Sequence, residues 1–183
     1  LDASGCENLV SLNVSGNAGL KLLDIEGCVK LEKLDCSNSI LLNLDVSQCR
    51  KLKELDCTAE NYWLNLAQPK GPLKKLDVSQ CRELEVLKCA GNPLSTLDVS
   101  QCTSLRDILC DVTNLQKLDV TNCTKLQSLR CSYNKIDTLD VSNCSQLEEL
   151  DCDKNSLNAL DIANCTKLKK LSCYYNKINN LDV

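Results

Sequence analysis

The chain of 183 residues contains no His, no Met and no Phe, and its aromatic side chains are one Trp and four Tyr. The absence of His removes the commonest general base and metal ligand. No apolar run approaches the ~18 residues that span a membrane. The formal net charge of −4 offers no basic surface for nucleic acid or anionic lipid. We therefore expect no direct membrane insertion and no nucleic-acid partner.

What the chain does contain is one pattern, LDVSxCxxLxxLxCxxNxLxx, repeated from end to end. Successive units start 21 residues apart, except for one gap of 22 and one of 32. The units begin at residues 1, 23, 44, 76, 97, 118, 139 and 160, with a partial ninth at 181–183 and an insertion at about 60–72. This regularity predicts a single repeat array over 1–183. Because solenoids need polar terminal units, we expect either that the chain is a fragment of a longer one or that a partner covers each end.

Each unit carries two tripeptides, LxC and LDV, whose inward and outward positions alternate as in a strand with one buried face. No segment shows the sustained 3.6-residue period of a helix. Stacking would pair LxC with the next LxC and LDV with the next LDV in parallel ladders. Leu columns would fill the interior, and an Asn ladder (Asn17, Asn92, Asn134, Asn155 and Asn176) would bond to turn carbonyls. The predicted fold is a repeat solenoid of the α/β type, predominantly β, with about eight 21-residue units.

The 15 Cys fall into two columns, one at the SxC position and one at the LxC position. Metal binding does not suit the spacing, because no CxxC pair occurs and no His completes a site. Disulfides do not suit parallel neighbours whose side chains point the same way, and the number of Cys is odd. In the first unit, Val14 replaces Cys, so the site accepts a small apolar side chain. We expect reduced, buried thiols and neither a metal nor a cofactor.

The segment LxxLxCxxNxL, repeated every 21 residues and coupled to LDVSxC, resembles the leucine-rich repeat proteins, in particular the internalin J-like, cysteine-bearing class of bacterial surface proteins. The resemblance covers essentially the whole chain. It implies a right-handed coil with parallel strands on the concave side, and a secreted or cell-surface location. It also implies a role in adhesion or partner recognition, and it brings no catalytic residues.

Function in a solenoid resides on outward positions and insertions, because the inward columns are committed to packing. The insertion carries Tyr62 and Trp63, which either project as binding residues or fold back over the solenoid. The outward side of the LxC strands and the turns after them carry the other candidates, together with outward-pointing Leu109 and Val112. These candidates are Arg130, Tyr133, Glu149, Asp151, Tyr174 and Tyr175.

Two functions are consistent with these features. The first is a non-enzymatic recognition or adhesion module that binds a protein or glycan through the concave face and the aromatic insertion. The alternative is a structural spacer or scaffold subunit within a larger surface assembly, without a ligand of its own. Catalysis is not expected, because no His is available to activate a Ser or Cys nucleophile and the Cys occupy core positions.

Overall fold

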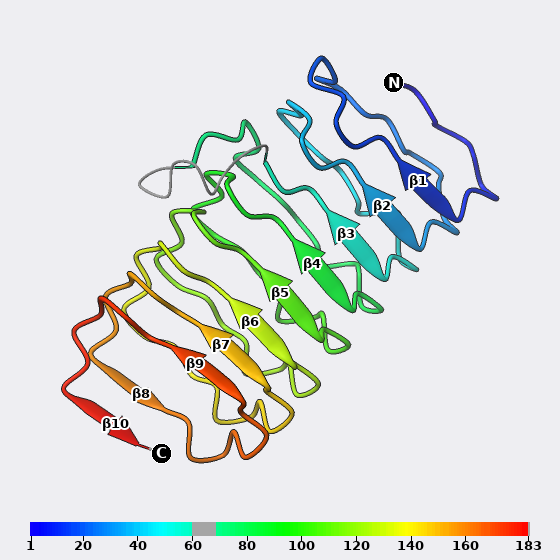
Figure 1. The fold of residues 1–183 in the computed structure, drawn as a ribbon. Helices are drawn as coiled ribbons and strands as arrows, with labels where there is room; N and C mark the ends of the chain where they lie inside the picture. Colours follow the sequence, from blue (N-terminus) through cyan, green and yellow to red (C-terminus); the bar gives the residue numbers. More distant parts are fainter. Residues whose placement is uncertain (60–68, 183) are drawn as a thin grey trace.

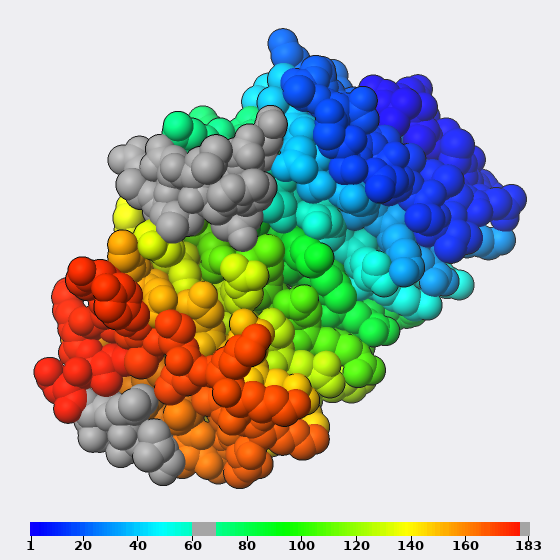
Figure 2. Space-filling model, viewed as in Figure 1, coloured from blue at the N-terminus to red at the C-terminus, as the bar shows by residue number. Residues whose placement is uncertain are grey.

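The computed structural model describes residues 1–59 and 69–182. In this part of the chain the regular elements are short strands, and no helix occurs. Eight of the strands lie side by side in one parallel sheet, in the order β1-β2-β3-β4-β5-β6-β7-β9, so the chain advances by one unit with each strand (Figure 1). The two ends of the chain lie at opposite ends of an elongated molecule (Figure 2). The predicted solenoid is confirmed.

Each strand of this sheet is three residues long and pairs in register with the next one. Leu12, for example, lies opposite Leu34, which lies opposite Leu55. The bounds are Ser11–Asn13 (β1), Lys33–Asp35 (β2), Glu54–Asp56 (β3), Val86–Lys88 (β4), Asp107–Leu109 (β5), Ser128–Arg130 (β6), Glu149–Asp151 (β7) and Lys170–Ser172 (β9). The middle residue of each strand points inward, and its neighbours face solvent on what we call the strand face.

The core is a set of columns that run the length of the stack. The middle strand residues from Leu34 to Leu150 are at most 2% exposed. The same columns are only partly buried at the two ends, at Leu12 and Leu171, because each end unit has one neighbour instead of two. The apolar area of any unit is therefore removed from water mainly by adjacent units, and a single unit could not fold alone.

The LDV segments on the other side of the coil, which we call the LDV face, differ from the prediction. Within residues 1–59 and 69–182, they pair as strands only between β8 (Ala159–Asp161) and β10 (Asn180–Asp182), and as the isolated bridges Asp2–Asp24 and Asp45–Asp77. The local turn bonds are the same in paired and unpaired units. The carboxylate of Asp98 accepts the N–H of Ser100 at 2.9 Å, and the carbonyl of Val99 accepts the N–H of Cys102 at 2.9 Å. Asp77, which does bridge, accepts the N–H of Ser79 at 2.9 Å in the same way.

Cysteine thiols form hydrogen bonds between neighbouring units at the LDV segments, where most of the second strand ladder is missing. Cys102 Sγ donates to the carbonyl of Val78 at 3.5 Å, and Cys165 Sγ donates to that of Val141 at 3.6 Å. All 15 Cys are free thiols, and 13 of them are buried. Burial raises the pKa of the Cys102 thiol to about 12. Cys6 is exposed and Cys173 half-buried, both in end units. The expectation of reduced, buried thiols is confirmed for all but these two.

The predicted Asn ladder forms, and its side chains cross between units. Asn134 Nδ2 donates to the carbonyls of Cys131 (3.0 Å) and Cys110 (2.9 Å), in its own and the preceding unit. Asn134 Oδ1 accepts the N–H of Leu115 at 2.9 Å. Asn155 and Asn176 repeat this pattern one and two units further along. These amides satisfy backbone groups that water does not reach.

The residue before the Asn position adopts a left-handed backbone in most units. Its φ is positive at Gly16, Asn38, Gly91, Val112, Tyr133, Lys154 and Tyr175. Val112 is only 1% exposed at this position, with φ 55°, so the expectation that it points outward is wrong. The backbone reversal sets the direction of this side chain, and strand alternation does not predict it. Leu109, at the end of β5, is half-buried.

Candidate functional site

The strand face carries most of the charge pairing in the molecule. Seven ion pairs form in the described residues, most of them between neighbouring units, such as Lys33–Glu54 at 2.7 Å and Glu148–Lys169 at 2.6 Å. Glu149 in β7 pairs with Lys170 in β9 at 3.5 Å. Apart from Asp111, these side chains are substantially exposed to solvent, so the pairs add little to stability. Their main effect is that most cations on this face already have a partner.

Three carboxylates near the ends of β5 and β7 form what we call the acidic cluster: Asp111, Asp151 and Asp153. The side chain of Asp111 is only 6% exposed, and burial raises its pKa to about 6. It accepts the N–H of Ser132 at 2.7 Å and lies 3.4 Å from Nη2 of Arg130. The hydroxyl of Ser132 donates to Asp151. The cluster is therefore linked across units through one serine.

Asp153 connects the acidic cluster to the next turn. Its Oδ1 accepts the hydroxyl of Ser172 at 2.7 Å and the backbone N–H of Tyr174 at 2.6 Å. Asp151 and Asp153 form no ion pair within the part of the chain that the structure covers. Negative charge without a cationic partner is thus concentrated beside Tyr174.

Tyr133, Lys154, Tyr174 and Tyr175 form a second group, the tyrosine patch. Tyr133, Lys154 and Tyr175 occupy the same position in three successive units, each with a left-handed backbone. The ammonium of Lys154 lies 4.7 Å from the ring centre of Tyr133 and 5.2 Å from that of Tyr175. The rings of Tyr174 and Tyr175 meet edge to face, with centroids 4.2 Å apart. Both rings are mostly exposed, at 62% and 64%.

The structure brings most of the predicted site residues into this one region. Arg130 and Asp151 belong to the acidic cluster or contact it, while Tyr133, Tyr174 and Tyr175 form the patch. Glu149 lies on the same strand as Asp151 and is paired with Lys170. Tyr62 and Trp63 lie outside the described residues. Sequence reasoning missed Lys154 and Asp111 as members of the site, although the 21-residue register places Lys154 in one column with Tyr133 and Tyr175.

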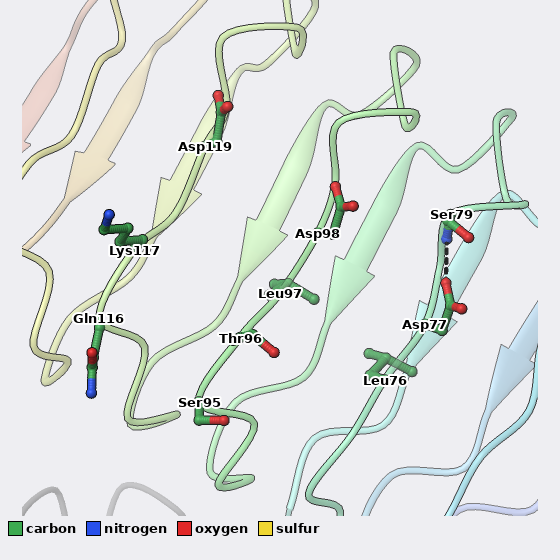
Figure 3. A pocket seen from close by; sticks show the side chains of 10 residues that line it. All are labelled: Leu76, Asp77, Ser79, Ser95, Thr96, Leu97, Asp98, Gln116, Lys117 and Asp119. Atoms are coloured by element: carbon green, nitrogen blue, oxygen red, sulfur yellow. Dashed lines mark hydrogen bonds between the residues drawn. The ribbon is translucent and has the colours of Figure 1, made fainter.

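A shallow hollow lies on the LDV face, lined by Leu76 and Leu97 (Figure 3). The carboxylates of Asp77, Asp98 and Asp119 stand along it in successive units. Each accepts the N–H of the residue two positions later, as Asp77 does from Ser79 at 2.9 Å. These bonds lower the pKa of the three carboxyls, so they are ionised at neutral pH. The row of carboxylates therefore closes the turns that follow the LDV segments.

Two further features of the described residues bear on the kind of site. Cys, Asp and Glu side chains do not gather in any group of three or more that could hold a metal ion. A membrane-crossing helix is likewise not found among these residues.

Comparison with known proteins gives matches among solved structures. No protein-family model matches the chain, and no curated protein does. The functional domain of InlJ from Listeria monocytogenes, which includes a cysteine ladder, has a TM-score of 0.86 and is 38% identical over 96% of this chain and 36% of that one. The chain therefore spans about a third of the length of that structure.

Two more distant matches support the fold alone. LIC12759, a leucine-rich repeat protein of Leptospira interrogans, has a TM-score of 0.81 at 22% identity, over 94% of this chain and 45% of that one. The plant peptide hormone receptor RGFR1, solved in complex with RGF2, has a TM-score of 0.71 at 19% identity, over 93% of this chain and 29% of that one. From its repeat, its parallel coil and its two cysteine columns, the chain belongs to the leucine-rich repeat proteins, in the cysteine-ladder class that internalin J represents.

Proposed function

We propose that the chain is a non-enzymatic recognition module that binds a protein partner through the strand face, centred on the tyrosine patch and the acidic cluster. One observation carries the proposal. Exposed rings and carboxylates without a cationic partner meet at Tyr174, whereas charges elsewhere on the strand face are mostly paired. Exposed tyrosines of this kind dominate binding energy at protein interfaces.

The structural relatives are consistent with this proposal. RGFR1 was solved in complex with RGF2, so a fold of this kind holds a protein ligand in that case. The resemblance to internalin J supports a location at the cell surface or outside the cell. The aromatic insertion, Tyr62 and Trp63, remains part of the proposed surface as a sequence-based prediction. A glycan ligand and a pure spacer role are the alternatives that an experiment has to separate.

The test is a binding screen against arrays of extracellular proteins and of glycans, with two matched variants. In the first, Tyr174→Ser and Tyr175→Asn remove the rings, and Asn tolerates the left-handed backbone at 175. In the second, Gln116→Ala and Lys117→Ala alter the LDV face. We expect a protein partner that the first variant loses at unchanged thermal stability and the second retains. Binding to glycans only, loss through the second variant only, or no partner at all would contradict the proposal.

A further inference from the structure

The tyrosine patch already binds a cation that belongs to the chain itself. The ammonium of Lys154 lies between the rings of Tyr133 and Tyr175, within 5.2 Å of both ring centres. Rings and a cation thus alternate along the column, one per unit, because the left-handed backbone points the three side chains the same way. Tyrosine faces attract cations through the ring quadrupole, and arginine is the more frequent partner.

We propose that the exposed rings of Tyr174 and Tyr175 bind an arginine side chain of a basic segment in the partner protein, which extends the alternation of rings and cations beyond Lys154. This inference rests on the proposed function and specifies the chemistry of the partner. Both rings are mostly exposed, so a planar guanidinium has access to them.

The charge around the two rings favours a cationic partner over a neutral or acidic one. Cations on the strand face are largely taken up by neighbouring acids, as Lys170 is by Glu149 and Lys169 by Glu148. The carboxylate of Asp153 bonds to the backbone N–H of Tyr174 and has no ion-pair partner among residues 1–59 and 69–182. A guanidinium stacked on Tyr174 would therefore meet an opposite charge at the same turn.

This region has an excess of negative charge, because the three carboxylates of the acidic cluster outnumber the two nearby cations, Arg130 and Lys154. The carboxylate of Asp111 is nearly fully buried, and its cationic neighbour is Arg130, at the long distance of 3.4 Å. Burial is the main cause of the raised pKa of Asp111; Ser132 and Arg130 oppose the shift, and the nearby carboxylates of Asp151 and Asp153 add to it. An arginine brought by the partner would offset this excess, whereas an acidic segment would increase it.

The experiment titrates the isotope-labelled chain with three synthetic peptides and follows backbone amide signals by NMR. The first peptide carries three arginines in a Gly–Ser background, the second has citrulline in their place, and the third has glutamate. Citrulline keeps the shape of arginine without its charge. We expect the arginine peptide to shift the signals of residues 153, 174 and 175, and to bind about three- to tenfold more tightly than the citrulline peptide.

Ring substitutions then separate stacking from simple charge attraction. A variant with Tyr174→Phe and Tyr175→Phe keeps both ring faces and should retain the preference for arginine. The Tyr174→Ser, Tyr175→Asn variant should lose it, with amide signals of the remaining strands unchanged as the sign of an intact fold. Equal affinity for the citrulline peptide, preference for the glutamate peptide, or shifts confined to the LDV face would overturn the inference. A protein partner that needs the two rings but docks through a neutral or acidic segment would overturn this inference and leave the proposed function standing.

Discussion

The N-terminal and C-terminal parts of the solenoid follow one repeat, yet they are held together differently. From Asn92 onward, each ladder Asn bonds to its own unit and to the preceding one. Near the N-terminus, Asn17 bonds only to carbonyls of its own unit, and Ser39 only to that of Cys36. Among the residues whose burial the structure describes, the exposed large aliphatic side chains also lie within the first 42: Leu1, Val10, Leu22, Val29, Ile40 and Leu42.

This contrast shows that units with similar sequences are not joined to their neighbours by equal numbers of hydrogen bonds. Packing of the Leu columns is common to both parts, whereas the bonds that ladder Asn side chains make across units are found, among the described residues, from Asn92 onward. The candidate site lies in that part, where the backbone that presents the tyrosines is fixed by these bonds. A rigid scaffold lowers the entropy cost of binding.

Replacing the ladder Asn should give the largest difference between the two parts. Asn134→Ala removes an amide with six hydrogen bonds and leaves buried backbone groups unpaired, so we expect a loss of about 3–5 kcal/mol in the free energy of unfolding. Asn17→Ala should cost about 1 kcal/mol or less, because its bonds are local and its unit is near solvent. Urea denaturation of both variants measures their losses in the free energy of unfolding. Equal losses would show that the two parts are equally cohesive.

Asp111 should make stability depend on pH in the C-terminal part. Its pKa is about 6 in the folded protein against 3.8 for the ordinary group, so the folded state binds the proton more tightly. The contribution of Asp111 to stability is therefore highest below pH 4 and declines as the pH rises through 6. Asp111→Asn should raise the free energy of unfolding at pH 7.5, by up to about 3 kcal/mol, and change it little at pH 4.

The control for this prediction is Asp98→Asn on the LDV face. The hydroxyl and backbone N–H of Ser100 lower the pKa of Asp98, so its ionised form is the one that stabilises the fold. That variant should be slightly less stable than the wild type at pH 7.5, the opposite sign to Asp111→Asn. Denaturation at the two pH values distinguishes them. A destabilised Asp111→Asn protein at pH 7.5 would mean that the contact with Arg130 outweighs the cost of burial.

Two threonines give the smallest and most local comparison. In the N-terminal part, Thr58 Oγ1 is buried without a hydrogen-bond partner among the described residues. In the C-terminal part, Thr113 Oγ1 bonds to the carbonyl of Cys110 at 2.8 Å and to Asn134 Oδ1 at 3.0 Å. Thr58→Val should be neutral or stabilising by about 1 kcal/mol, while Thr113→Val should cost about 1–2 kcal/mol. Thermal unfolding measured side by side checks the pair, and a stabilised Thr113→Val protein would contradict this account.

The repeat register predicted most of the architecture, since a period of 21 residues assigns each Leu, Cys and Asn to a column. It correctly placed the buried thiols and the Asn ladder. It wrongly predicted a continuous second ladder of LDV segments, since most of these segments do not pair; the turn bond of Asp98 recurs at the bridged Asp45 and Asp77 and does not account for the difference.

The candidate site was predictable in part. Tyr133, Tyr174 and Tyr175 were singled out as outward residues, and they do lie together. The burial of Asp111 and Val112 was not foreseen, because both follow the strand at the point where the backbone turns left-handed and the rule of alternation ends. A positive φ at a β-branched residue has no reliable sequence signature. The spacing of Lys154 could have revealed its place between the rings.

Folding protects the interior thiols from chemical reaction. Thirteen of the 15 sulfurs are shielded from solvent, and burial keeps the pKa of those such as Cys144 far above physiological pH, so the reactive thiolate is scarce. The same sulfurs become accessible together when the coil opens. In an oxidising medium, the thiols of an unfolded chain would then form random disulfides before the chain could refold. The durability of such a protein would depend on how rarely it unfolds, that is, on a rate rather than on an equilibrium.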